Sequence, residues 1–336
     1  MKINFRQKPL HEQVIVITGG SSGIGLACAR LACSKGARVV ITSNNESELQ
    51  EAKDNLSRDG HKIESIAADV ADYEAVVSVA DFTLETFGRF DTWVNNAGIH
   101  IFGKIERNDT RDMRRVFDVN YWGAVHGSRV AVKHLQKSGG TLINIGSVLS
   151  ARSVPLQGIY GASKHALQGY TDALRMELEK TNAPVAVTLI KPSSISTPIP
   201  YHSKNIMPER ARLPFPLYDP EVAADVILFC AENPRRSFIV GGAGKGAVTG
   251  EKFFPALVDK AMETVVWNMQ KAKGEPRRED ALHEPTEHSP RIRGDHDYYV
   301  RKFSLYNAAA KNPVIAVITG GLTAALGFLL FKRKGG

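Results

Sequence analysis

The amino-acid sequence predicts an α/β fold, in which a doubly wound, mostly parallel sheet of seven strands is followed by a linker and a C-terminal transmembrane helix. Two observations predict the sheet. Short runs rich in Val and Ile alternate with longer segments of helical periodicity, and the first run leads directly into a glycine-rich turn. Near-continuous apolar strands separated by helices are typical of a parallel sheet covered on both faces. A long uncharged run near the C-terminus predicts the transmembrane helix.

The predicted strands and helices alternate along most of the chain. Strands are expected at residues 14–17, 39–41, 63–68, 92–94, 141–145, 185–190 and 238–240. Helices are expected around residues 23–35, 46–57, 72–87, 110–137, 159–180 and 220–231. Because this alternation continues to about residue 245, the first domain is expected to span residues 1–250.

Four segments follow the first domain. Residues 251–270 carry apolar side chains at helical spacing, which predicts an amphipathic helix that packs on the domain or lies at a membrane. Residues 271–312 begin with a charged, Pro-containing stretch without apolar periodicity and predict a flexible linker. Residues 313–331 form an uncharged run of 19 residues, which is long enough to span a bilayer, and residues 332–336 form a basic tail.

The net charge of +8 lies mainly near the C-terminus, where residues from 271 onward carry 12 Lys/Arg against 7 Asp/Glu. No stripe of basic and aromatic residues suggests a nucleic-acid partner, so attraction to a membrane surface is the better interpretation. Basic residues on both sides of the uncharged run leave its orientation open on charge alone. Since no signal peptide is seen, we expect a single-pass C-terminal membrane anchor with the first domain facing the cytoplasm.

The composition, 43% apolar and 23% charged, is that of an ordinary globular protein. Its three cysteines, Cys28, Cys33 and Cys230, are spaced neither as a disulfide framework nor as metal ligands. We therefore expect buried, apolar cysteines in a reducing environment and no metal site.

A phosphate-binding turn is expected after the first strand, where Thr18-Gly-Gly-Ser-Ser-Gly-Ile-Gly25 opens a helix. Glycines allow a tight turn and a close approach of the backbone to a pyrophosphate, whose charge then meets the helix N-terminus. The order Gly-x-x-x-Gly-x-Gly differs from the commoner Gly-x-Gly-x-x-Gly fingerprint.

Tyr160 and Lys164 are four residues apart at the start of a predicted helix, so their side chains share one face. An ammonium beside a phenol favours the phenolate and lowers its pKa, which makes the tyrosine a usable acid/base. This spacing alone is more often that of a solvated helix face. Other motifs are needed to assign the pair to chemistry.

In order and spacing, these motifs resemble the standard branch of the short-chain dehydrogenase/reductase family over residues 14 to about 245. The motifs are the turn at 18–25, Asn95-Asn96-Ala97-Gly98, Asn120, Ser147 and the Tyr160/Lys164 pair. The resemblance implies a Rossmann-type fold, and an oxidoreductase that uses NAD(P)(H) to interconvert a secondary alcohol and a ketone or aldehyde. It also allows a homo-oligomer, formed through the helices at 110–137 and 159–180.

The resemblance implies a catalytic group of Asn120, Ser147, Tyr160 and Lys164. Ser147 would polarise the substrate carbonyl, and Tyr160 would carry the proton. Lys164 would bind the nicotinamide ribose and lower the Tyr160 pKa, while Asn120 would position a relay water. The implied cofactor-binding residues are Gly19, Ser21, Ser22, Gly23, Ile24, Gly25, Ser43, Asn44, Asp69, Val70, Asn96, Ala97, Gly98, Tyr160, Lys164, Ile195 and Thr197. Two structural alternatives remain: Asn95 would brace backbone, and Asp69 would cap the helix that begins near Asp72.

Cofactor choice between NAD and NADP stays open. The end of the second strand, Ser43-Asn44-Asn45, holds neither an acidic residue for a free 2′-hydroxyl nor an arginine for a 2′-phosphate. Ser22 is likewise not the basic residue often found there in NADP-dependent relatives. The missing acid removes a repulsion and favours NADP slightly.

Two further features bear on function. Pro192-Ser193 stands where the family usually has Pro-Gly, which gives the backbone less freedom. The loop from Ile199 to Tyr218 is rich in aromatic and aliphatic residues, which favours an apolar substrate, although these side chains could equally pack the loop on the domain. The competing function is a catalytically silent NAD(P)-binding sensor or scaffold at a membrane.

Overall fold

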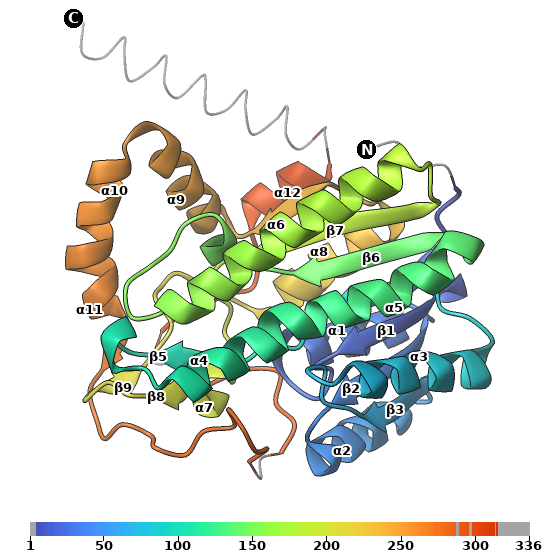
Figure 1. Cartoon of the computed structure of the whole chain (residues 1–336), viewed down its shortest axis with the longest axis horizontal. Coiled ribbons are helices and arrows are strands. Elements are labelled where there is room, and N and C mark those ends of the chain that lie inside the picture. Colours follow the sequence, from blue (N-terminus) through green and yellow to red (C-terminus); the bar gives the residue numbers. More distant parts are fainter. Residues whose placement is uncertain (1–4, 287–288, 296–297, 313, 315–336) are drawn as a thin grey trace, which may run out of the picture.

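The computed structural model of the protein describes residues 5–286, 289–295, 298–312 and 314. At its centre lies a parallel sheet of seven strands in the order β11-β7-β6-β4-β1-β2-β3 (Figure 1). The strands are β1 (Val14–Thr18), β2 (Arg38–Ser43), β3 (Ile63–Ala67), β4 (Thr92–Asn95), β6 (Gly140–Ile145), β7 (Val185–Pro192) and β11 (Ser237–Val240). The seven predicted strands and the doubly wound topology are therefore confirmed.

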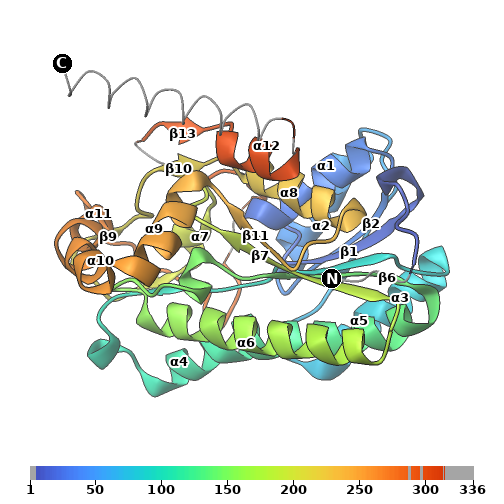
Figure 2. The ribbon, with the colours of Figure 1, turned by 90° about the horizontal axis from the view of Figure 1, so that it is seen from above.

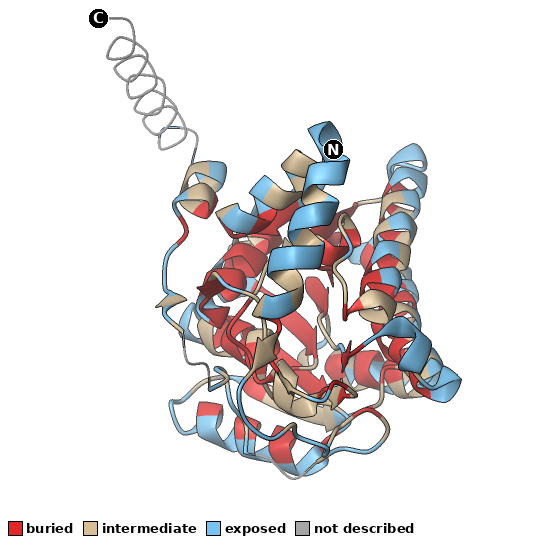
Figure 3. Cartoon of the chain, turned by 90° about the vertical axis from the view of Figure 1, so that its left-hand side faces the viewer, coloured by how far each residue is buried: buried red, intermediate tan, exposed pale blue. Residues whose placement is uncertain are grey.

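Helices cover both faces of the sheet (Figure 2). One face carries α1 (Gly23–Ser34), α2 (Glu46–Ser57) and α8 (Pro220–Glu232), and the other carries α3 (Tyr73–Phe87), α5 (Gly123–Ser138) and α6 (Gly158–Lys180). Along β1, Ile15 and Ile17 join the first apolar cluster, whereas Val14 and Val16 join the second, as the alternation of side chains along a strand requires. Buried residues accordingly fill the sheet and the inner faces of the helices (Figure 3).

The three cysteines are buried and free, as predicted. They lie in α1 and α8, two helices that pack against each other. Burial raises the pKa of Cys33 and of Cys230 to about 12. The reactive thiolate is therefore scarce at neutral pH, and these residues act as core side chains.

The predicted helix at 110–137 is divided into α4 (Thr110–Phe117), a π-helical turn at Asp118–Trp122, and α5. A π-helical turn adds a residue to the helical repeat and often occurs at functional sites. This one contains Asn120, whose side chain is buried.

The region between β7 and α8 folds over the carboxyl end of the sheet through short elements. These are α7 (Ile199–His202), β8 (Lys204–Asn205), β9 (Arg210–Ala211) and β10 (Leu217–Tyr218). β8 pairs with β5 (Ile101–Phe102) after β4, which ties the region to the rest of the domain.

The structure differs from the single helix predicted at 251–270. It has α9 (Gly242–Phe253), α10 (Pro255–Ala261), a π-helical turn at Met262–Val266, and α11 (Trp267–Met269), so the predicted domain boundary at 250 falls inside α9. The chain breaks at Phe254 (φ −138°, ψ 58°) because a following proline disfavours the helical conformation. Phe253, Phe254 and Leu257 are 71%, 63% and 69% exposed and do not pack on the domain.

The described residues of the predicted linker at 271–312 are packed on the domain. β12 (Lys271–Ala272) pairs with β9, β13 (Val300–Arg301) pairs with β10, and α12 (Leu305–Lys311) follows. Leu282 is fully buried, in a cluster with Ile101 and Val116. Some of its charged residues pair with the domain, among them Lys271 with Glu209 and Arg293 with Asp219, so a polar composition does not prevent this stretch from packing. We call the described residues between 271 and 301 the C-terminal strap.

The predicted transmembrane helix at 313–331 and the basic tail at 332–336 lie outside the described residues, apart from Val314. Within the part of the chain that the structure describes, no helix is both long enough and apolar enough to cross a bilayer. The anchor therefore stays a prediction from sequence.

Candidate active site

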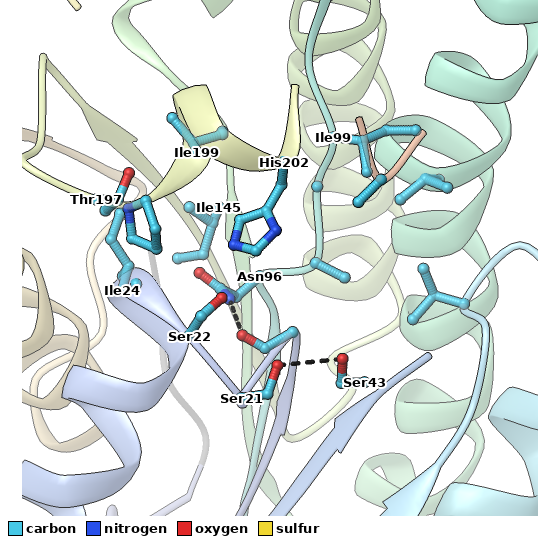
Figure 4. A pocket seen from close by; sticks show the side chains of 18 of the residues that line it. Ser21, Ser22, Ile24, Ser43, Asn96, Ile99, Ile145, Thr197, Ile199 and His202 are labelled. Atoms are coloured by element: carbon cyan, nitrogen blue, oxygen red, sulfur yellow. Dashed lines mark hydrogen bonds between the residues drawn. The ribbon is translucent and has the colours of Figure 1, made fainter. Parts of the chain in front are cut away.

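A pocket of about 250 Å³ opens at the carboxyl ends of β1, β2, β4, β6 and β7, where open α/β sheets bind ligands. All but two of the predicted cofactor-binding and catalytic residues line this pocket. The exceptions, Gly25 and Asn120, are both buried behind its wall. Figure 4 shows Ser21, in the turn after β1, hydrogen-bonded to Ser43 at the end of β2. Ile199 and His202 of α7 lie across the pocket in that view.

The glycine turn is clamped to the loop after β4. Thr18 Oγ1 accepts hydrogen bonds from Asn96 N (3.0 Å) and Ala97 N (3.1 Å). In return, Asn96 Nδ2 donates to the carbonyl oxygens of Thr18 and Gly19, each at 2.9 Å. Gly19 has a φ of +63°, a conformation that suits glycine. The Asn96 side chain thus lines the pocket and also fixes the shape of the turn.

Asn95 braces the interior of the domain, as the structural alternative predicted. Its Oδ1 accepts from Trp93 Nε1, and its Nδ2 donates to Asn144 Oδ1, both at 2.8 Å. With these contacts satisfied, Asn95 lies behind the pocket wall and holds β4 against its neighbours.

Tyr160 and Lys164 both line the pocket from the first turns of α6. Lys164 is 3% exposed, and its Nζ donates to Ile145 O at 2.9 Å and lies 5.6 Å from the centre of the Tyr160 ring. Burial lowers the pKa of Lys164 to about 8 and raises the pKa of Tyr160 to about 12. The predicted lowering of the Tyr160 pKa by Lys164 is therefore wrong for this structure, because desolvation of the phenolate dominates.

Ser147 is held next to Tyr160 at the end of β6. Its Oγ accepts from Leu149 N, and its backbone N–H donates to Ser150 Oγ, both at 3.1 Å. A hydrogen bond from its side chain opposes the rise in the Tyr160 pKa. The two hydroxyl-bearing residues that the sequence assigned to chemistry thus line the same part of the pocket.

Asn120 is anchored on the backbone after β4. Its Oδ1 accepts from Ile99 N (2.8 Å), and its Nδ2 donates to Ile99 O (2.9 Å) and Ser163 Oγ (3.2 Å). Through these bonds the Asn120 side chain fixes the backbone at Ile99, which lines the pocket. The role of Asn120 in a water relay stays a prediction.

His100 is a neighbour of Tyr160 that sequence reasoning missed. Its ring centre lies 4.3 Å from that of Tyr160 and 4.1 Å from that of Phe102. His100 Nε2 contacts Gln157 Oε1 at 2.8 Å, and Gln157 Nε2 donates to Gln270 Oε1 at 2.6 Å. Burial lowers the pKa of His100 to about 4, so the ring is neutral and positions the phenol. A single histidine at no special spacing gives no signal in the sequence.

Asp69 forms an ion pair with Arg115 from α4 (2.6 Å), and both residues line the pocket. Asp69 Oδ1 also accepts from Ala71 N at 2.9 Å. The residue that caps α3 is Asp72, whose side chain accepts from Glu74 N. The alternative in which Asp69 caps this helix is therefore wrong, and Arg115 is a pocket residue that the motifs did not indicate.

The C-terminal strap crosses the mouth of the pocket, and its residues Ala281, Pro285 and Thr286 contribute to the lining. Arg291 O accepts from Gly23 N of the glycine turn at 2.8 Å, and Thr286 O accepts from Asn45 Nδ2 at 2.9 Å. These contacts are made by backbone carbonyls of the strap, so no side-chain pattern could have predicted them.

Ser193 fits its place after β7 because the facing residue is a glycine. Ser193 Oγ donates to Val240 O at 2.7 Å, and a Cβ on Gly241 would lie only 2.3 Å from that hydroxyl oxygen. The departure from Pro-Gly at Pro192-Ser193 is thus accommodated, and Ile195 and Thr197 still line the pocket.

Comparison with known proteins agrees with this geometry. The family model for short chain dehydrogenases matches residues 13–205, which is more than half of the chain. The uncharacterized oxidoreductase YxnA of Bacillus subtilis is 42% identical over 330 residues, covering 96% of this chain and 92% of the relative. This alignment includes the C-terminal strap.

Other relatives align over shorter stretches. The putative oxidoreductase SadH of Mycobacterium tuberculosis is 32% identical over 237 residues, covering 68% of this chain and 86% of the relative. The mouse dehydrogenase/reductase SDR family member 7B is 33% identical over 193 residues, covering 56% of this chain and 59% of the relative. With the sheet order, the pocket and the family match in agreement, the chain belongs to the short-chain dehydrogenase family of oxidoreductases.

Proposed function

We propose that the protein uses NAD(P)(H) to interconvert a secondary alcohol and a ketone or aldehyde, with Tyr160 as the acid/base. The observation that supports this most is the placement of Ser147, Tyr160 and Lys164 in the same pocket as the glycine turn. The chemistry of the lining suits a dinucleotide, because a glycine turn that opens a helix lies at one end of the pocket and a proton carrier lies at the other. When bound, the cofactor would supply or accept the hydride.

The chain's own residues would handle the proton and the carbonyl oxygen. Because burial raises the pKa of Tyr160 to about 12, the phenol carries its proton at neutral pH and can donate it to the substrate oxygen during reduction. Ser147 would donate a hydrogen bond to the same oxygen. Donation of that proton leaves a phenolate, which Lys164 would stabilise. In the oxidative direction, this phenolate would take the proton of the substrate hydroxyl, which returns Tyr160 to the phenol.

An apolar substrate is proposed from the composition of the pocket wall. Besides the polar groups, the lining includes the aliphatic side chains of Ile99, Ile145, Ile195, Ile199 and Leu213. Burying an apolar substrate against such side chains is favourable because it removes their surface from water.

A panel of apolar ketones, aldehydes and secondary alcohols, assayed with NADH, NADPH and their oxidised forms, tests the proposed function. We expect turnover of at least one compound and none of matched hydrocarbons that lack the oxygen. Binding of a cofactor without turnover of any compound would instead support the alternative, a catalytically silent NAD(P)-binding sensor or scaffold.

We also propose that residues 313–331 anchor the protein in a membrane, with the first domain on the cytoplasmic side. The uncharged run itself supports this, as do the exposed side chains of Phe253, Phe254 and Leu257, since aromatic residues favour the membrane interface. Deleting residues 313–336 is expected to move the protein from the membrane fraction to the soluble fraction with turnover retained. If membrane association persists, α9 and α10 are the binding elements instead.

A further inference from the structure

An acidic residue, Glu48, lines the pocket beside the end of β2, although the strand end itself offers none. Glu48 comes from the first turn of α2 rather than from the end of β2. It lines the pocket beside Ser43 and Asn45, and it is 5% exposed. The end of β2 itself holds no acidic residue, as predicted, but the neighbouring helix brings one to the same part of the pocket.

The carboxylate of Glu48 is turned away from its usual partner. A glutamate at the third helical position commonly accepts from the backbone N–H of the N-cap residue, which here is Asn45. Asn45 N donates to Ser43 Oγ instead (3.2 Å), and Glu48 Oε2 accepts from Ser21 Oγ of the glycine turn (3.1 Å). Glu48 Oε1 is buried and has no hydrogen-bond partner among the residues that the structure describes.

The described part of the pocket also lacks a free cation at this end. Two basic residues line the described pocket, Lys164 and Arg115. Lys164 lies beside Tyr160, and Arg115 forms an ion pair with Asp69 and donates from Nε to Leu282 O at 3.1 Å. Within the described residues, Glu48 itself has no ion-pair partner. A phosphate placed here would meet an uncompensated carboxylate.

Building on the proposed function, we propose that Glu48 makes the pocket selective for NAD(H) over NADP(H). A free 2′-hydroxyl is neutral and can donate a hydrogen bond toward the Ser43, Ser21 and Glu48 network, as an acidic residue near β2 allows in dinucleotide-binding folds. A 2′-phosphate would bring negative charge next to a carboxylate in a wall of low dielectric, where like charges repel strongly. This reverses the slight preference for NADP that the sequence suggested.

Equilibrium binding of NADH and NADPH to the full-length protein tests the proposal without relying on turnover. We expect the unmodified protein to bind NADH at least about tenfold more tightly, which corresponds to ~1.4 kcal/mol. Glu48→Gln keeps an acceptor for Ser21 but removes the charge, so the ratio of the two dissociation constants should fall about tenfold. Glu48→Asp, which keeps the charge, should retain the preference for NADH.

Asp54→Asn is the matched control, because Asp54 is an exposed acidic residue further along the same helix. This variant should leave the ratio of dissociation constants unchanged. Tighter binding of NADPH by the unmodified protein, or an unchanged ratio in Glu48→Gln, would overturn the role of Glu48 while leaving the proposed function intact. Failure to bind either cofactor would instead overturn the proposed function, and this inference with it.

Discussion

Replacing Tyr160 by Phe is expected to lower kcat by about 10²- to 10⁴-fold, the range that general acid/base catalysis contributes. The variant loses only the hydroxyl group, which lines the pocket with Ser147 and would meet the substrate oxygen. The aromatic ring remains and can still pack on His100, whose ring centre is 4.3 Å away. The Kd of the cofactor should therefore change little, and comparing kcat with this Kd separates a chemical role from a structural one.

Tyr170→Phe provides a matched control on the same helix. Tyr170 is a half-buried residue of α6 outside the pocket lining, so removing its hydroxyl should leave kcat within about twofold, because no group that would react lies beside it. Turnover of Tyr160→Phe at the rate of the unmodified protein would contradict the proposed mechanism. Equal losses in both variants would point to a general disturbance of α6.

The sheet could be predicted from sequence because its strands are buried on both faces. β1 reads as an uninterrupted apolar run, and all five of its residues are buried. The position of the proposed catalytic residues could be predicted because strand ends and helical spacing fix relative positions: Ser147 follows β6, while Tyr160 and Lys164 share one face of α6. Local periodicity and the order of the motifs were therefore enough to predict that these residues lie in one pocket.

Features that depend on tertiary packing could not be predicted in the same way. The polar composition of the strap and its lack of apolar periodicity predict a linker. In the structure a single apolar side chain, Leu282, is fully buried, and Arg293 pairs with Asp219 at 2.7 Å, which is enough to hold the strap on the domain. The Tyr160 pKa was predicted in the wrong direction because it depends on how completely its neighbours exclude water. The sequence gives no sign that Glu48 lines the pocket, because a glutamate at this helical position commonly bonds the backbone of its own helix N-terminus.

Replacing Gly25 by Ala is expected to destabilise the domain by at least ~3 kcal/mol, at the upper end of overpacking costs. A Cβ at this position would lie 2.0 Å from Gly19 O and 2.7 Å from Asn96 Nδ2. Gly19 O already accepts the hydrogen bond from Asn96, so the turn cannot move aside without breaking the clamp between β1 and β4. Because the same turn would bind the pyrophosphate, we also expect cofactor affinity to fall about tenfold or more, ~1.4 kcal/mol.

Gly169→Ala is the matched control for this substitution. A Cβ on Gly169, which lies in the interior of α6, would meet no atom within 4 Å. The added methyl group should stabilise the helix by ~0.5–1 kcal/mol, because alanine loses less backbone entropy on folding than glycine. Denaturant unfolding and cofactor binding measured on both variants distinguish a steric requirement from a general effect of glycine. If Gly25→Ala unfolds and binds like the unmodified protein, Gly25 is dispensable and the turn does not depend on the close approach to Gly19.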